Sequence, residues 1–441
     1  MISEFIGLNR VEFTNDSDVI NPGKTIFNPR FSGVQTLEGD DKIIGNDEIN
    51  GDFVLGVFVE IPGQNSNPTA SVDLSSQVTL HVDGIRNQGS ILTNGGSDVL
   101  AGTATAKVSA VAETMSEAIV YANTLDTSAI SNIVNAVDIK AIANGINNSG
   151  RIATGDDSDT VDGDLDGSIA AVATATVDVT AIIEEISQAP VSDGLTAFVD
   201  VIAVSIAQAE IIARGINNQQ GTIITGEGGD TIGATATSSS ATLSEASAST
   251  VASAPEENQA LAGAIVNALA EASDEAIAID NSNGLILMGK IDDEDEDRIE
   301  ATAEASGKAI AIKNIGGEIR TGDGKDLITG FATGSESYGI FGGDILTGAG
   351  DDRVEASSFG GGVTINMGHG ADYVQGFGDS TVYGGAGFDT LSLGAYSKSD
   401  FSIYTEHNFT VFKLGDTTMQ TNGFDNYVFA DGNYSNDLLI S

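Results

Sequence analysis

The chain of 441 residues contains no cysteine and no tryptophan, and only six prolines and three histidines. Without cysteine, disulfide bonds and zinc sites built on thiolates are excluded. His81, His369 and His407 lie far apart and form no HExxH motif, so the zinc-protease signature is missing. No run of about 18 apolar residues is present, so we expect no transmembrane helix and no membrane insertion.

Positive charge is also scarce, because 18 Lys and Arg stand against 64 Asp and Glu, for a net charge of −46. Nucleic acid is not an expected partner, since phosphate binding needs clustered Lys and Arg. Like charges at this density oppose a compact state unless cations neutralise them. The simplest alternative explanation is an acidic, solvated surface without bound ions.

Glycine, with 54 residues, recurs in a nine-residue motif that ends in aspartate and an apolar residue. The clearest copies span 321–328, 347–354 and 384–391, and they match G-G-x-G-x-D-x-U-x, where U is a large apolar residue. Glycine permits positive φ, aspartate supplies a carboxylate, and the apolar residue begins a strand. Two such loops stacked one strand spacing apart can share a Ca²⁺ ion, which takes six to eight oxygen ligands.

The predicted Ca²⁺ ligands are four carboxylates and eight loop carbonyls. The carboxylates belong to Asp326, Asp352, Asp372 and Asp389, and the carbonyls to Gly322, Gly324, Gly348, Gly350, Gly368, Gly370, Gly385 and Gly387.

The spacing of the motif aspartates shrinks along the chain, from at most 71 residues to 17. The series is Asp41, Asp98, Asp159, Asp230, Asp297, Asp326, Asp352, Asp372 and Asp389. A second motif, an Asn-Gly turn, precedes the loops of the early repeats, and its asparagines are Asn87, Asn148, Asn218, Asn281 and Asn314. We expect these asparagines to stack as a ladder in an all-β, right-handed parallel β-helix or β-roll, with wide early coils and narrow late ones.

Period-two stretches such as 101–112 and 133–143 predict long strands with small alanines on one face. We expect excursions from the coils at 115–132 and 182–195. The Ala-, Glu- and Leu-rich segment at about 255–278 predicts an inserted helix, because Leu261, Ile265 and Leu269 have helical spacing.

The motifs resemble those of the RTX, or haemolysin-type, calcium-binding β-roll proteins, most closely over 311–392. The tail around Phe401–Tyr404 and Gly423–Gly432 is similar to the aromatic segment that closes many RTX arrays. The long Ala- and Thr-rich repeats loosely resemble those of large cyanobacterial surface proteins. Asn94 and Asp157 depart from the pattern, because each replaces a loop glycine.

This resemblance implies type I secretion through an uncleaved C-terminal signal, with folding outside the cell, where Ca²⁺ is abundant. The segment Met1–Arg30 shows no Sec signal peptide, in agreement with that route. We therefore divide the chain into an N-terminal cap or arm (1–35), a wide solenoid (36–308) and a calcium-binding β-roll (309–395). The last part (396–441) is a C-terminal cap with the secretion signal.

The favoured function is that of a secreted, extracellular or cell-surface structural protein without catalytic activity. It could form a homo-oligomer or filament through the solenoid ends, or contact surface or matrix polysaccharide. One alternative is a β-helix enzyme acting on polysaccharide, since carboxylate pairs can perform acid–base chemistry. Another is binding to a flat ice or mineral surface through threonine ladders that include Thr103, Thr105, Thr235, Thr237 and Thr302.

Overall fold

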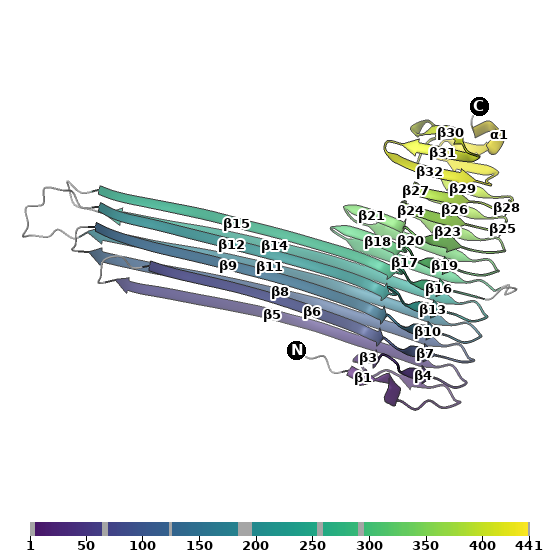
Figure 1. Cartoon of the computed structure of the whole chain (residues 1–441), viewed down its shortest axis with the longest axis horizontal. Coiled ribbons are helices and arrows are strands. Elements are labelled where there is room, and N and C mark those ends of the chain that lie inside the picture. The colour runs from purple at the N-terminus through teal and green to yellow at the C-terminus, as the bar shows by residue number, and fades with distance from the viewer. Residues whose placement is uncertain are drawn as a thin grey trace, which may run out of the picture.

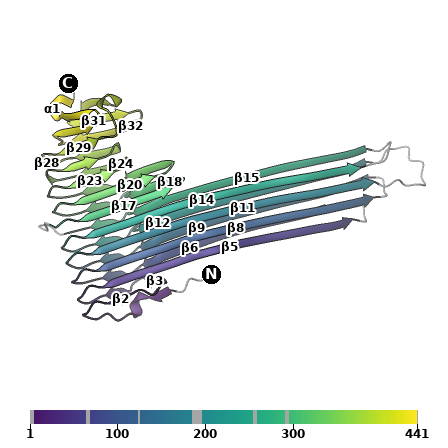
Figure 2. The same ribbon diagram turned by 180° about the vertical axis from the view of Figure 1, so that it is seen from behind.

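The computed structural model describes residues 5–63, 69–122, 126–183, 196–253, 259–289 and 295–439. These residues form a parallel β-solenoid, as the sequence predicts. Stacked coils make a spine, and a long two-layer arm leaves the spine on one side (Figures 1 and 2). Among the described residues the single α-helix is the short α1 (Asn436–Leu439).

Each complete coil contains an outgoing strand, a returning strand and a short strand. The outgoing sheet contains β2 (Val19–Ile20), β5 (Lys42–Gly63), β8 (Val99–Ala122), β11 (Thr160–Ile183), β14 (Thr231–Ser253), β17 (Arg298–Ala305), β20 (Leu327–Thr333), β23 (Arg353–Ala356), β26 (Tyr373–Gln375), β29 (Thr390–Leu393), β33 (Asn426–Phe429) and β34 (Gly432–Ser435).

The returning strands are β1 (Phe5–Gly7), β3 (Thr25–Asn28), β6 (Thr69–Asn87), β9 (Asp126–Asn148), β12 (Thr196–Asn217), β15 (Gln259–Asp280), β18 (Lys308–Lys313), β21 (Glu336–Phe341), β24 (Phe359–Asn366) and β27 (Gly378–Tyr383), followed by β32 (Thr417–Asn422), β31 (Phe409–Leu414) and β30 (Ser402–Glu406). The short strands are β4 (Gly33–Gln35), β7 (Ser90–Leu92), β10 (Arg151–Ala153), β13 (Thr222–Ile224), β16 (Leu285–Leu287), β19 (Glu318–Arg320) and β22 (Asp344–Leu346). Two-residue strands β25 (His369–Gly370) and β28 (Ala386–Gly387) pair within the glycine loops.

The arm consists of the outer parts of four outgoing and four returning strands, β5 to β15. Strands β8 and β11 each have 24 residues, which corresponds to about 80 Å at about 3.3 Å per residue. In β8 the buried positions alternate along the strand, at Ala104, Ala106, Val108, Ala110 and Ala112. Small side chains at these positions let the two layers of the arm pack closely.

Two local predictions for this region are wrong. The predicted helix at 255–278 is a strand over its described part, because 259–278 belongs to β15, which pairs with β12 in an unbroken parallel ladder over most of its length. Residues 255–258 lie outside the described residues. The predicted excursion at 115–132 also continues as strand in β8 and β9 over its described part, and 123–125 lie outside the described residues. Of the predicted excursion at 182–195, residues 182 and 183 belong to β11 and 184–195 lie outside the described residues. Strand pairing outweighs the helix propensity of Ala, Leu and Glu here.

The predicted asparagine ladder is confirmed and fully buried. Each side-chain amide nitrogen donates to the amide oxygen of the next asparagine, at 2.8 Å from Asn87 to Asn148 and 2.7 Å from Asn148 to Asn218. The same 2.7 Å bond joins Asn218 to Asn281, and Asn281 to Asn314. Asn28, which the sequence analysis did not single out, extends the ladder with a 2.8 Å bond to Asn87.

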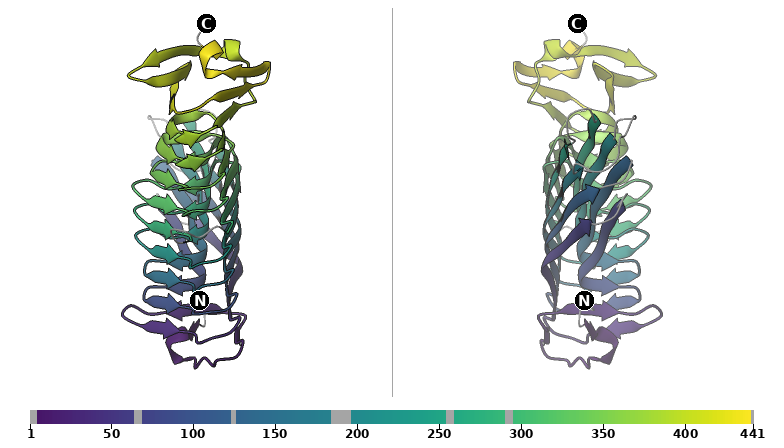
Figure 3. Two further views of the ribbon diagram at one scale, coloured as in Figure 1. Left: turned by 90° about the vertical axis from the view of Figure 1, so that its right-hand side faces the viewer. Right: turned by 90° about the vertical axis from the view of Figure 1, so that its left-hand side faces the viewer.

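The two ends of the spine differ (Figure 3). At the N-terminal end, β2, β3 and β4 stack on β5, β6 and β7, so the segment predicted as a cap already forms part of a coil. At the C-terminal end, antiparallel strands β30–β32 and β33–β34 close the stack. Their core is aromatic, with the ring of Phe412 in contact with those of Phe401, Tyr427 and Phe429.

Candidate metal centre

The motif aspartates stand in one column along the spine. In the late coils, the backbone N–H of Asp326 donates to Oδ1 of Asp352 at 3.0 Å, and that of Asp352 to Oδ1 of Asp372 at 2.8 Å. Asp372 donates in the same way to Asp389 at 3.0 Å. The column continues back through the early coils to Asp41, so every motif aspartate occupies the same slot.

This aspartate ladder continues beyond both ends of the predicted series. The backbone N–H of Asp18 donates to Oδ1 of Asp41 at 2.8 Å, and that of Asp389 donates to Oδ2 of Asp425 at 3.0 Å. Sequence analysis missed both residues as members of the ladder. The available signal for Asp425 was the Gly423-Phe424-Asp425 triplet, whereas nothing glycine-rich precedes Asp18.

In Asp352, Asp372 and Asp389 the second carboxylate oxygen, Oδ2, is buried without a hydrogen-bond partner. In the early coils Oδ2 of Asp98 and Asp159 is also buried, and the hydroxyl groups of Thr93 and Thr154 lie beside these two carboxyl groups. The side chains of Asp352 and Asp372 are 1% exposed and that of Asp389 is 0% exposed. An unpaired buried carboxylate oxygen is costly, so each of these atoms calls for a proton or a cation.

Burial raises the pKa of these carboxyl groups. Desolvation, together with the neighbouring charges of Asp352 and Asp389, raises the pKa of Asp372 to about 7. Desolvation likewise raises the pKa of Asp352 and of Asp389. In the early coils it raises the pKa of Asp159 to about 7 and that of Asp98 to about 6.

The loop glycines form two columns beside the aspartate ladder. In the first, Gly322, Gly348, Gly368 and Gly385 have φ between 91° and 102°. In the second, Gly324, Gly350, Gly370 and Gly387 have φ between 133° and 147°. A Cβ atom on Gly350 would lie 1.4 Å from the carbonyl oxygen of Gly324, and one on Gly370 would lie 1.6 Å from that of Gly350. Each glycine carbonyl thus points at the next loop, where no side chain fits.

The stacked loops are joined through their backbone. The N–H of His369 donates to the carbonyl of Gly348 at 2.9 Å, and that of Ala386 to the carbonyl of Gly368 at 2.8 Å. A carbonyl oxygen has a second lone pair, so these bonds leave the first glycine column able to coordinate a cation. The predicted site residues therefore lie together, in register, along one edge of the spine.

These residues fit Ca²⁺ better than a metal that requires a compact side-chain cluster. Among the described residues, no group of three or more His, Asp or Glu side chains converges in a metal-binding arrangement. A cation would therefore be held by one carboxylate from each loop together with backbone carbonyls. Hard oxygen ligands, several of them carbonyls, in a site of flexible geometry suit Ca²⁺.

The early loops have a different conformation from the late ones. They keep one left-handed column, at Gly39, Gly96, Asp157 and Gly228, whose φ values are 115°, 118°, 83° and 118°. Asp157, which departs from the motif, adopts the strained positive φ that its neighbours in the column reach with glycine. The late loops have two such positions each, so the double glycine column begins at Gly322.

Calcium-depleted protein should be more stable at pH 5 than at pH 8. The folded-state pKa values of Asp98, Asp159 and Asp372 lie above their usual value of 3.8, so the folded state binds their protons more tightly. Their stabilising contribution is complete below about pH 4 and is lost as pH rises through about 6 to 7. Thermal melts of calcium-depleted chain from pH 5 to 8 measure this effect, and Asp372→Asn should flatten the dependence. A melting temperature that rises toward pH 8 would contradict it.

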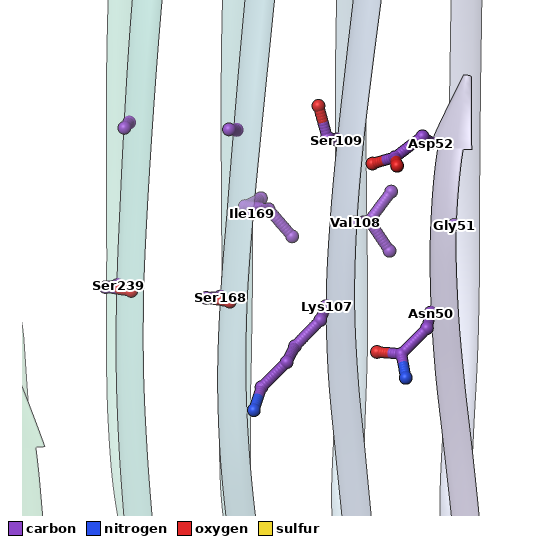
Figure 4. A pocket seen from close by; sticks show the side chains of 11 residues that line it. Asn50, Gly51, Asp52, Lys107, Val108, Ser109, Ser168, Ile169 and Ser239 are labelled. Carbon is purple, nitrogen blue, oxygen red and sulfur yellow. The ribbon is translucent and has the colours of Figure 1, made fainter.

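A shallow hollow of about 580 Å³ crosses the outgoing sheet of the arm (Figure 4). Its polar side chains follow the strand register, since Asn50, Lys107, Ser168 and Ser239 occupy equivalent positions on four neighbouring strands. Lys107 also pairs with Asp166 at 3.0 Å. We would expect the polar residues of a catalytic cleft to interrupt the repeat. Those of this hollow do not.

The threonines considered for flat-surface binding do not form continuous ladders. Thr103, Thr235 and Thr302 share one row across the sheet, but Asp164 stands between the first two. In the next row, Asp166 separates Thr105 from Thr237. A carboxylate thus interrupts each of these two rows of hydroxyl groups.

Comparison with models of known protein families, with curated proteins and with solved structures gives no match to this chain. In the part of the chain that the structure describes, no helix has the length and apolarity needed to cross a membrane.

Proposed function

We propose that this chain is a secreted structural protein of the cell surface or its surroundings, whose spine is stabilised by Ca²⁺ bound between stacked glycine–aspartate loops. The observation that carries the proposal is the column of buried carboxylate oxygens without hydrogen-bond partners, at Asp352, Asp372 and Asp389, beside two columns of glycine carbonyls that point at the next loop. A divalent cation at this edge would satisfy these oxygens and relieve the repulsion between successive carboxylates.

The ligands of this proposal come from neighbouring coils. One loop supplies its aspartate, such as Asp352, and an adjacent loop supplies glycine carbonyls and a second aspartate. A bound ion therefore links successive coils and stabilises the register of the spine. In the metal-free chain the same carboxylates oppose stacking, which keeps the chain less compact where Ca²⁺ is scarce. This dependence agrees with export of an unfolded chain and folding outside the cell.

Calcium titration by isothermal calorimetry tests the proposal. The variant Asp326→Asn, Asp352→Asn, Asp372→Asn, Asp389→Asn should lose the binding assigned to the late loops. A matched control carries the same charge change at exposed residues, as Asp344→Asn, Asp351→Asn, Asp379→Asn, Asp416→Asn. We expect the control to bind as many Ca²⁺ ions as the wild type.

The outcome that would overturn the proposal is equal Ca²⁺ stoichiometry in the ladder variant and in the wild type. Loss of the same number of ions in both variants would also overturn it, since binding would then follow overall charge rather than the loops. Parallel titration with Mg²⁺ should give weaker binding, because Mg²⁺ demands near-octahedral geometry and gives up its water reluctantly.

A further inference from the structure

The returning sheet of the arm ends in a strand with one bare edge. On one side β15 pairs with β12 along almost its whole length. On its other side β18 covers only Glu275–Asp280. Among the described residues no strand lies beside the remaining edge, Gln259–Asp274, so a long row of backbone donors and acceptors faces outward.

The same part of β15 exposes apolar side chains on both of its faces. Its inward-facing residues Val266, Ala270 and Ala272 are exposed, although their register partners in β12, Ala203, Ala207 and Ala209, are at most 3% exposed. On the outer face, Ile265 and Leu269 are 50% and 47% exposed. The inner positions have side chains typical of a core, but the strand that follows β14 in the facing sheet, β17, ends at Ala305 and does not extend over them.

This edge has almost no charge in a chain of net charge −46. The segment 239–253 of β14 contains one charged residue, Glu245, and 259–274 of β15 contains two, Glu271 and the buried Asp274. Natural proteins commonly block an open strand edge with lysine, proline or inward charges. The opposite edge of the arm has such residues, including Glu48 and Asp52 on β5 and Asp73 on β6. The β15 edge is therefore the place where a second acidic chain would meet the least repulsion.

We infer that β15 pairs with β15 of a second copy of this chain, in antiparallel orientation about a twofold axis. A parallel arrangement would place the second spine at the same end of the arm, where β17 to β34 of the first spine already stand (Figure 1). The antiparallel arrangement places the second spine beyond the tip of the first arm. Two L-shaped copies then fit together, and the returning sheet runs through both arms.

The size of this contact is sufficient for a specific dimer. The bare edge is about 50 Å long at about 3.3 Å per residue, and the arm is about 10 Å thick, so two copies bury on the order of 1,000 Å² in total. That value is near the lower limit for a stable interface, and the backbone hydrogen bonds of the shared sheet add to it. The contact uses the side of the arm and not the ends of the spine, where we had expected self-assembly.

Sedimentation of the full chain at fixed Ca²⁺ concentration tests the inference. The wild type should be a dimer, and the charged variant Ile265→Lys, Leu269→Lys should dissociate with a dimer Kd at least tenfold higher. Val54→Lys on β5 is the matched control, because Val54 is also on an edge strand and 72% exposed, and it should remain dimeric. All three chains should melt alike when dilute, which separates loss of pairing from loss of folding.

The absence of native cysteine allows a second, geometric test. Single cysteines placed in turn along 263–273 should form a disulfide-linked dimer at a position near the twofold axis and not at its two ends. A wild-type chain that stays monomeric at all concentrations would overturn the inference. So would a dimer that tolerates the charged β15 variant, or one that crosslinks only when cysteines are placed on both β5 and β14. None of these results depends on whether Ca²⁺ occupies the aspartate ladder.

Discussion

In millimolar Ca²⁺ the wild-type chain should melt at a markedly higher temperature than in chelator, and Asp352→Ala should lose much of that difference. Ca²⁺ that binds only the folded chain stabilises it by about 2.7 kcal/mol per independent site at a hundredfold excess over Kd. Several sites on neighbouring coils therefore make folding of the narrow spine steeply dependent on Ca²⁺. Asp352 accepts the N–H of Asp326 and donates its own to Asp372, so its loss removes a ligand in the middle of the column.

Asp352→Ala should reduce the Ca²⁺-dependent gain more than Asp389→Ala does. The sequence presents Asp389 as the last carboxylate, but the structure adds Asp425 above it. Asp389 is therefore not the last member of the ladder, and the ranking depends on the glycine loops on either side of each aspartate. Asp352 stands between loops that each have two left-handed glycines, whereas the rung of Asp425 contributes only Gly423 to the glycine columns.

Far-UV circular dichroism and melting temperature against free Ca²⁺ measure both effects. Asp351→Asn is the matched control, because Asp351 adjoins Asp352 in sequence but is exposed and pairs with Lys325 at 3.3 Å. Equal melting of the wild type in chelator and in Ca²⁺ would contradict the metal site. The loops would then be glycine turns without a bound ion.

Gly350→Ala should destabilise the spine by at least about 4 kcal/mol, in chelator as well as in Ca²⁺. The added Cβ would lie 1.4 Å from the backbone carbonyl oxygen of Gly324, and φ at this position is 141°. Backbone atoms of a stacked loop cannot move aside without breaking the ladder, and alanine does not readily adopt this φ. A loss of stability that persists in chelator distinguishes this steric effect from the loss of a ligand in Asp352→Ala.

Gly56→Ala is the control for this second prediction. Gly56 lies on β5, and a Cβ there would meet no atom within 4 Å. Its substitution should change the unfolding free energy by no more than about 0.5 kcal/mol. Thermal and denaturant unfolding of both variants measures the difference. A Gly350→Ala chain that unfolds like the wild type would show that the loops do not stack as closely as the structure has them.

Sequence reasoning identified the coils, the asparagine ladder and the alignment of the late loops because each leaves a periodic mark. An asparagine or aspartate that must hydrogen-bond to the equivalent residue of the next coil recurs at the same position of every repeat. It does so whatever number of residues separates one repeat from the next. Asn28 and Asp18 escaped notice because their coil is short and lacks the glycine motif.

The sequence by itself thus determined the repeat, the stacking residues and the candidate ligands of this protein. Only the tertiary structure decided the form of the arm. The segment 259–278 has the composition of a helix, yet it becomes a strand because β12 offers it an unbroken row of backbone partners. The tertiary structure also decided which edge stays bare, since that depends on β18 covering only Glu275–Asp280 while β15 continues to the tip of the arm. Local composition predicts neither feature, because each depends on a neighbouring strand from another coil.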